Sequence, residues 1–350
     1  MLEHLKVIDA SSVLAGPSVG TFFAELGAKV IKVEHPKHAD VTRSWKLPSE
    51  DSENSVSAYF SSINYKKDYI KLDLKQETDH AQFLALIKDA DILITNFKHG
   101  DDVKLNIQDE SLLAVNPSLI IGKINGYGND NDRVAYDLIL QAETGFMSMN
   151  GTPESGPVKM PIAMIDILAA HHLKEAILLA LINRAKTNKG TSISVSLYDA
   201  ALSSLANQGS NYLMENHIPQ RIGSLHPNIA PYGELFKTKE DDLITFAIGS
   251  DTHFSKLCTV LGLEQLIHDV RYKSNQDRVI NRTELQQVLQ ERISSRGTTE
   301  LLKKLCSLHV PAGKVKDLKE VFESIEAQEL VRRETIDNVE TSRVTSVVFK

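Results

Sequence analysis

The sequence has little cysteine and no long apolar run. Only Cys258 and Cys306 are present, which excludes a disulfide framework and a four-cysteine zinc site and is typical of a reducing compartment. No stretch reaches the roughly 18 apolar residues that cross a bilayer, and the first residues lack the basic and apolar regions of a signal peptide. We therefore expect a cytoplasmic protein with no membrane partner.

The sequence also contains fewer basic than acidic residues. The 350 residues contain 39 Lys and Arg against 46 Asp and Glu, a net charge of −7, which argues against a nucleic-acid partner bound through overall charge. Hydrophobic residues make up 42% and charged residues 24%, values typical of globular proteins, and the length favours about two domains.

Several common catalytic motifs are missing. The chain has no G-x-G-x-x-G dinucleotide motif, no P-loop and no G-x-S-x-G nucleophile elbow, which removes support for nicotinamide, nucleoside triphosphate or serine-hydrolase chemistry. The densest histidine groups, His35 with His38 and His171 with His172, lack H-E-x-x-H spacing. We therefore predict no metal site and no tightly bound cofactor.

Apolar segments rich in Val and Ile alternate with amphipathic segments in the N-terminal part of the chain. This pattern predicts strands at 6–13, 29–34, 69–74, 91–97 and 118–124, with helices near 15–26, 77–89 and 110–115. Further helices are expected at 138–149, 167–185 and 199–214, with a strand at 191–197. The alternation predicts an α/β fold, a Rossmann-like domain with a mainly parallel sheet covered by helices.

A second, smaller domain follows a segment rich in Pro and Gly. We expect a large domain at 1–216, a linker at 217–232, a small α+β domain at 233–325 and a C-terminal segment at 326–350 that returns toward the large domain. Strands at 233–236 and 243–248 form a hairpin pattern, and helices are predicted at 253–261, 282–294 and 299–308.

Asp166 interrupts an apolar run, Pro161–Ala170, and needs a physical explanation. One interpretation is an N-cap, because Asp accepts hydrogen bonds from amides at the start of a helix. The other is a covalent nucleophile in an apolar cleft, where little hydration must be removed before attack. If the segment is helical, Ala163, Ala169 and Ala170 share the face of Asp166 and leave room for a substrate. The two interpretations are compatible.

Asn96 and Phe97 close an apolar strand, and ligands of open α/β sheets bind beyond the carboxyl ends of strands. An amide and an aromatic ring at this place suit the binding of an adenine or ribose. The alternative is that Asn96 caps a turn and Phe97 packs in the core. Four lysines cluster around one predicted strand, as phosphate binding requires, although a solvated face is the alternative. These are Lys66, Lys67, Lys71 and Lys75.

Taken together, these segments resemble the family III CoA-transferases, the CaiB/BaiF group that includes formyl-CoA transferase and the α-methylacyl-CoA racemases. The resemblance extends over most of the chain, and the order and spacing of its motifs carry it. They are Ala15–Pro17, Gly27–Glu34, Lys67–Lys75, Asn96-Phe97, Gly126–Gly128, Tyr136–Ala142, Gly145–Gly151, the segment around Asp166, His226–Tyr232 and Val310–Gly313.

The resemblance implies a CoA transfer from an acyl-CoA thioester to a small carboxylic acid, with Asp166 as the nucleophile and an aspartyl-CoA thioester as intermediate. CoA would then be a substrate rather than a bound cofactor. The positions that the resemblance assigns to substrate or CoA contacts are Leu14, Ala15, His35, Leu72, Asp73, Lys75, Asn96, Phe97, Lys104, Arg133, Tyr136, Asp137 and Gly249. An interlocked homodimer is also implied.

Several positions depart from the pattern of the family, among them Lys98 and His99 after Asn96-Phe97. Leu14 replaces a glutamine that contacts the acyl group in formyl-CoA transferase, which argues against formate and oxalate as substrates. His35 replaces an arginine beside the nucleotide, and Tyr136 stands where the racemases have a catalytic histidine. Because racemisation needs a base on each face of the carbon, we rank the transferase above a racemase or epimerase. A catalytically silent CoA-binding protein is the third alternative.

Overall fold

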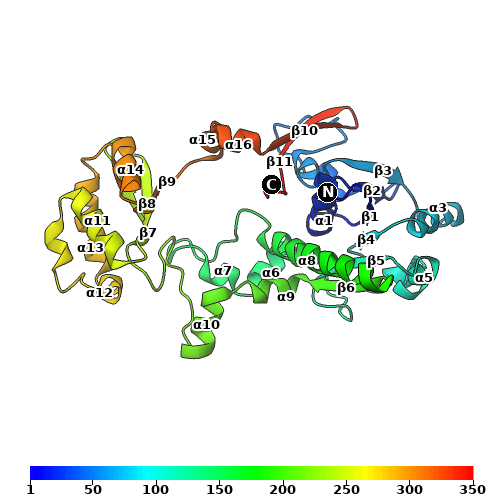
Figure 1. The fold of residues 1–350 in the computed structure, drawn as a ribbon, viewed down its shortest axis with the longest axis horizontal. Helices are drawn as coiled ribbons and strands as arrows, with labels where there is room; N and C mark the ends of the chain where they lie inside the picture. Colours follow the sequence, from blue (N-terminus) through cyan, green and yellow to red (C-terminus); the bar gives the residue numbers. More distant parts are fainter. Residues whose placement is uncertain (350) are drawn as a thin grey trace. The chain divides into compact units, whose positions relative to one another are not determined.

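The computed structural model describes residues 1–349, which form two compact units. The first unit contains Met1–Ser148, Lys159–Pro219 and the residues from Gln328 onward, and the second contains Met149–Val158 and Gln220–Ala327. In the described residues, no helix is long and apolar enough to cross a membrane. The elements are labelled in Figure 1.

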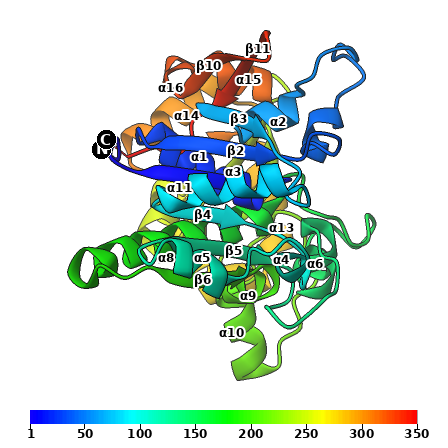
Figure 2. The ribbon, with the colours of Figure 1, turned by 90° about the vertical axis from the view of Figure 1, so that its right-hand side faces the viewer.

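The first unit is built on a six-stranded sheet in which every pair of neighbouring strands is parallel. Its order is β3-β2-β1-β4-β5-β6, and Figure 2 shows this order from β3 above to β6 below. The strands are β1 Lys6–Ala10, β2 Lys29–Glu34, β3 Lys67–Lys71, β4 Ile92–Thr95, β5 Ile120–Asn125 and β6 Thr191–Ser196. The predicted α/β class with a mainly parallel sheet is confirmed.

Helices cover both faces of this sheet because alternate residues of each strand point to opposite sides. Val7 of β1 packs in one core with α1 and α8, and the next residue, Ile8, packs in another with α3 and α5. Both side chains are fully buried. Figure 1 shows the long helix α8 lying beside α6, α9 and β6.

The helices of the first unit are shorter in two places than the sequence pattern predicts. The helix expected at 138–149 is two helices, α6 and α7, because Gly145 between them has a φ of +90°. The helix expected at 199–214 is likewise divided into α9 and α10. The helices are α1 Ala15–Glu25, η1 Val41–Ser44, α2 Ala58–Ser62, α3 Glu77–Lys88, α4 Asp101–Lys104, α5 Asp109–Val115, α6 Asp137–Glu143, α7 Phe146–Met149, α8 Met164–Thr187, α9 Leu197–Ser203 and α10 Ala206–Glu215.

The second unit has an antiparallel sheet and its own apolar core. Strands β7 Tyr232–Lys237 and β8 Leu243–Ala247 form the predicted hairpin, and β9 Ala312–Lys314 pairs with β8. Helices α11 Asp251–Leu261, η2 Glu264–Ile267, α12 Asn275–Ile280, α13 Arg282–Ile293, α14 Thr298–Ser307 and α15 Leu318–Phe322 belong to this unit. The chain then continues through α16 Ile325–Glu329 to the hairpin of β10 Val331–Ile336 and β11 Val339–Val344, which packs against α2 in the first unit.

Candidate active site

The order of the strands reverses between β1 and β4, and a cavity opens beyond their carboxyl ends. In such sheets the chain leaves the two strands in opposite directions, which creates a crevice for ligands. The cavity has a volume of about 100 Å³ and is lined by loops that follow β1, β4 and β5, by the residues before α6 and by the first turns of α8 and α9. Its lining residues are Ser12, Val13, Leu14, Ala15, Asn96, Ile124, Asn125, Gly126, Ala135, Tyr136, Asp166 and Leu197.

Asp166 is the acid of this cavity. It is the third residue of α8 and only 7% exposed. Burial, and to a smaller extent the nearby Asp137 carboxylate, raises the pKa of its carboxyl group to about 7, and no hydrogen bond within residues 1–349 offsets them. The helix dipole favours a negative charge in this first turn, but the desolvation of the carboxylate outweighs it.

The start of α8 is fixed by Asp137 and not by Asp166. The N-cap of α8 is Ala163, whose side chain cannot accept a hydrogen bond, so the N-cap interpretation of Asp166 is wrong. Asp137 instead accepts a hydrogen bond from the Ile165 amide at 2.7 Å. Its other oxygen accepts one from Gln141 Nε2 at 2.6 Å. The Asp166 carboxylate is therefore left without a structural partner in the described chain.

Tyr59 is a further neighbour of the two carboxylates. Its pKa is raised to about 12 by burial and by the charges of Asp166, Asp137 and Asp40. The ring stacks edge to face on Trp45, with 5.1 Å between the ring centroids. At neutral pH the phenol is therefore protonated and can donate a hydrogen bond.

Five of the predicted site residues line the same cavity. They are Leu14, Ala15, Asn96, Tyr136 and Asp166. Asn96 also has a structural task, because its Oδ1 accepts a hydrogen bond from the Ser12 amide at 3.0 Å and its Nδ2 donates to the Ser12 carbonyl at 2.8 Å. Asn96 thus joins the ends of β1 and β4.

The residues predicted to contact the rest of CoA lie in two other pockets of the first unit. Phe97 lines a pocket of about 330 Å³ that shares Ile124 and Asn125 with the Asp166 cavity. Lys75 and Lys104 line a polar pocket of about 300 Å³ between the start of α3 and the end of α4. Two cations at one pocket suit a phosphate group.

The remaining predicted residues do not line these pockets. His35 Nε2 lies 3.5 Å from Asp73 Oδ1, and Leu72, beside Asp73, is buried. Arg133 pairs with Glu143 at 2.6 Å and its guanidinium stacks over the Tyr127 ring. Gly249 belongs to the second unit, where its amide donates to the Ala247 carbonyl.

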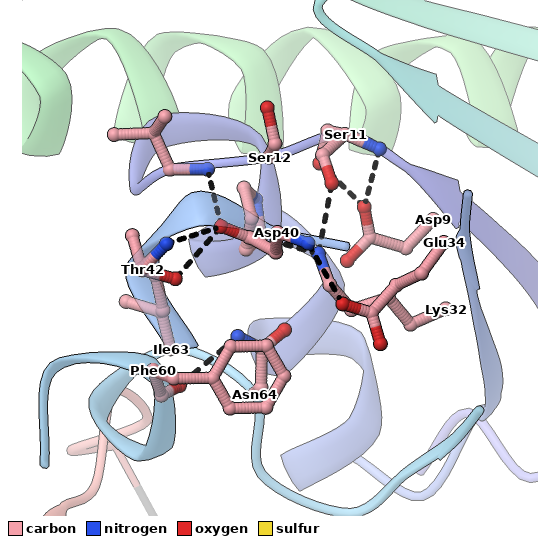
Figure 3. Close-up of polar contacts among 12 residues, drawn as sticks. Asp9, Ser11, Ser12, Lys32, Glu34, Asp40, Thr42, Phe60, Ile63 and Asn64 are labelled. Carbon is pink, nitrogen blue, oxygen red and sulfur yellow. Dashed lines mark hydrogen bonds and ion pairs between the residues drawn. The ribbon is translucent and has the colours of Figure 1, made fainter. Parts of the chain in front are cut away.

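One lysine of the predicted phosphate cluster has a different environment. Lys67 is buried and its Nζ donates to Asp9 at 2.8 Å, to Asn64 at 2.9 Å and to two backbone carbonyls. Figure 3 shows Asp9 and Asn64 among the polar contacts that lie beneath the loop after β1. All three protons of the ammonium group are used, so Lys67 holds the core together and is not free for a phosphate.

Sequence reasoning missed Ser12, Val13, Asn125 and Gly126, which also line the cavity. A signal for them was present, because each lies at or directly after the carboxyl end of a predicted parallel strand, where ligands bind. Tyr59 had no such signal, because it lies in the short helix α2, far from Asp166 in sequence. Within residues 1–349, no group of three or more His, Cys, Asp or Glu side chains could hold a metal ion.

The sequence matches the model of CoA-transferase family III over residues 2–350. The chain belongs to CoA-transferase family III. A succinate–glutarate CoA-transferase of Agrobacterium fabrum is 37% identical over 333 residues, which cover 93% of this chain and 83% of that protein. An acetyl-CoA:oxalate CoA-transferase of Acetobacter aceti is 34% identical over 322 residues, which cover 91% of this chain and 81% of that protein.

A family III fold is also found in solved structures. A CaiB/BaiF family protein from Brucella suis has a TM-score of 0.85 and 36% sequence identity, and the match covers 100% of this chain and 92% of that one. The resemblance stated from the sequence is therefore confirmed, and the chain is an enzyme of the CoA-transferase class.

Proposed function

We propose that this family III enzyme moves CoA from an acyl-CoA thioester to a small carboxylic acid through a covalent intermediate at Asp166. The observation that carries the proposal is a single buried carboxylate, unpaired in the described chain, that lines a cavity at the switch point of a parallel sheet. An ion with so little solvation is a ready nucleophile once its proton has left.

The proposed reaction has four steps. A carboxylate oxygen of Asp166 attacks the thioester carbon, the C–S bond breaks, and CoA leaves as a thiolate from an acyl-aspartyl anhydride. The thiolate then attacks Cγ of Asp166 and expels the donor acid, which leaves an aspartyl-CoA thioester. The acceptor carboxylate attacks the same carbon and frees the thiolate again. The thiolate finally attacks the acceptor's acyl carbon, which yields the new thioester and restores the Asp166 carboxylate.

Supporting groups for these steps come from the first unit. Lys75 and Lys104 are suited to the phosphates of CoA and Phe97 to its adenine or ribose, since each lines a pocket near the carboxyl edge of the sheet. Tyr59 carries its proton at neutral pH and can stabilise the oxyanion of a tetrahedral intermediate. The roles of His35, Asp73, Arg133 and Gly249 rest on the resemblance alone.

Short dicarboxylic acids are the first substrates to test. The relative from Agrobacterium fabrum is named for succinate and glutarate, and the relative from Acetobacter aceti for acetyl-CoA and oxalate. Leu14 lines the cavity of this chain, and its apolar side chain favours the methylene groups of succinate or glutarate over the compact, fully polar oxalate.

Mass spectrometry of the intact protein tests the covalent step. The wild type is mixed with succinyl-CoA or other acyl-CoA thioesters and quenched with hydroxylamine or borohydride, and the modified residue is located by peptide mapping. We expect modification at Asp166 in the wild type and in Asp137→Asn, and none in Asp166→Ala. Absence of an adduct and of CoA transfer with every donor, together with entry of solvent deuterium at the α-carbon of a branched acyl-CoA, would favour a racemase.

The interlocked homodimer and the cytoplasmic location remain predictions. Sedimentation of the full chain at micromolar concentration tests the first, and a stable monomer would contradict it. Fractionation of cells that express the tagged full chain tests the second.

A further inference from the structure

The loop between β1 and α1 forms one wall of the Asp166 cavity and has an unusual backbone. Ser12, Val13, Leu14 and Ala15 all line the cavity. Val13 has a φ of +72°, in the left-handed region, where the Cβ of a β-branched residue is crowded by its own backbone. A residue keeps such a conformation only where its surroundings impose it.

Side chains from three other segments of the chain hold this loop. Lys32 on β2 donates to the Ser11 carbonyl at 2.8 Å, and Asp40 accepts a hydrogen bond from the Val13 amide at 3.3 Å. Asn96 holds both backbone groups of Ser12, as described above. The loop is therefore held by its backbone at three consecutive residues.

Lys32 and Asp40 also form a fully buried ion pair. Lys32 Nζ lies 3.0 Å from Asp40 Oδ2, and the two side chains are 0% and 1% exposed. Figure 3 shows the Asp40 carboxylate between Thr42 and the loop after β1. Asp40 Oδ1 accepts from the Thr42 amide at 3.1 Å and from its hydroxyl at 2.7 Å, which fixes the carboxylate in place.

The backbone of Asp40 is fixed as well. Its amide donates to Glu34 Oε1 at 3.0 Å, and Glu34 accepts hydrogen bonds from Nε and Nη2 of Arg43 at 2.9 and 2.7 Å. A buried ion pair adds little stability over well-packed apolar residues, and its best-supported use is to specify one arrangement of the chain. Here that arrangement includes the strained conformation of Val13.

We propose that Asp40 and Lys32 are positioning residues of the active site. They hold Val13 in the left-handed region and so place Leu14 and Ala15 against the cavity of Asp166. The inference rests on the proposed function of Asp166. Neither residue lines the cavity, so both act on the reaction through the loop. Loss of the pair lets Val13 relax to an ordinary backbone conformation and moves the wall of the cavity.

Steady-state kinetics of the full-length enzyme tests the proposal. Because a displacement of about 1 Å near the reacting atoms costs roughly a hundredfold in rate, we expect Asp40→Ala to lower kcat by about tenfold to a hundredfold. The KM for acyl-CoA should change less than about threefold, because Lys75 and Lys104 lie in a different pocket. If Asp40→Ala does not fold, the double variant K32M/D40A takes its place in the experiment. The double variant removes both charges of the ion pair and so leaves neither of them buried without a partner.

Glu25→Ala is the matched control. Glu25 pairs with Arg343 in the same unit, both side chains are 4% exposed, and the pair lies at the other end of α1. Its loss should lower the melting temperature but leave kcat of the folded enzyme within about twofold of the wild type. If Asp40→Ala and Glu25→Ala lost equal amounts of kcat, the role of Asp40 would be purely structural, and the proposal would be overturned.

Val13→Gly supplies a rescue that a purely structural role would not give. Glycine adopts a φ of +72° without steric cost, so the loop no longer needs Asp40 to impose it. We expect Val13→Gly to raise kcat several-fold when added to Asp40→Ala. No gain in the Asp40→Ala background would contradict the proposal.

Hydrogen exchange separates this proposal from the proposed function. If the wild type transfers no CoA, the proposed function is wrong, but the hydrogen exchange of the loop between β1 and α1 can still be measured. We expect faster exchange of the Val13 amide in Asp40→Ala, or in K32M/D40A, than in Glu25→Ala. Unchanged exchange at Val13 would show that Asp40 does not hold the loop, whatever the reaction of Asp166.

Discussion

Asp137 caps the helix that carries Asp166. The Asp137 carboxylate accepts the Ile165 amide at 2.7 Å and so fixes the residue that directly precedes Asp166. After burial, the charge of Asp137 is also the second cause of the raised pKa of Asp166. Asp137 therefore fixes the position of Asp166 and adds to the effect of burial on its proton affinity.

The activity should depend on pH through Asp166. Because burial raises the pKa of this carboxyl to about 7, the nucleophile is mostly protonated below that pH. We expect kcat/KM for succinyl-CoA to rise about tenfold per pH unit below pH 7 and to level off above it. A profile that is flat between pH 5 and 8, measured with enzyme shown to stay folded, would contradict this.

Asp137→Asn should shift that profile to lower pH. The amide oxygen of asparagine can still accept the hydrogen bond from Ile165, but the negative charge beside Asp166 is gone. The pKa of Asp166 then falls, and we expect the rising limb to move to lower pH. Asp199→Asn, which alters a carboxylate bonded to Ser196 at the start of α9, is the control and should leave the limb in place.

Asp166→Asn should stabilise the fold at alkaline pH. Since the pKa of Asp166 is higher in the folded chain than the ordinary 3.8, the folded chain binds a proton more tightly than the unfolded chain between about pH 4 and 7. The stability of the wild type therefore falls as pH rises through this range.

The variant has no such proton to lose. Its advantage in unfolding free energy should be well below 1 kcal/mol at pH 4 and approach about 4 kcal/mol at pH 8. Urea denaturation at the two pH values measures both numbers. An advantage that does not grow with pH would mean that Asp166 has an ordinary pKa.

Lys67→Met should destabilise the first unit strongly. Asp9 is 0% exposed, and its carboxylate lies 2.8 Å from Lys67 Nζ. The substitution leaves this buried carboxylate without its ionic partner. Breaking one side of a buried pair costs about 3–5 kcal/mol in unfolding free energy. Lys71→Met, at an exposed position of the same strand, should cost less than about 0.5 kcal/mol in the same denaturation experiment.

Lys104→Met should weaken the binding of CoA without slowing the chemistry. Loss of one cation from the pocket shared with Lys75 should raise the Kd for CoA about threefold to tenfold and reduce its dependence on salt. Titration calorimetry measures both effects, and kcat should stay within about twofold. Lys88→Met, at the other end of α3, is the control. Equal Kd values for the two variants would remove Lys104 from the CoA site.

Much of the large sheet follows from local patterns in the sequence. The predicted bounds of the strand at 29–34 and the helix at 77–89 agree with the structure to within a residue. Both predictions rest on signals between near neighbours, namely apolar periodicity and the helix stop at Gly27. The two divided helices were missed because a break at Gly145 depends on a backbone conformation that apolar periodicity does not record.

The sequence by itself determined the α/β class, the family and the identity of Asp166 as the candidate nucleophile. Only the tertiary structure decided what surrounds it: the cap from Asp137, the ring of Tyr59, and the ion pair of Lys32 and Asp40 beneath Val13. The physical reason is the range of the forces involved. Periodicity and turns act between near neighbours, whereas a pKa or a strained backbone is set by groups that only the folded sheet brings together.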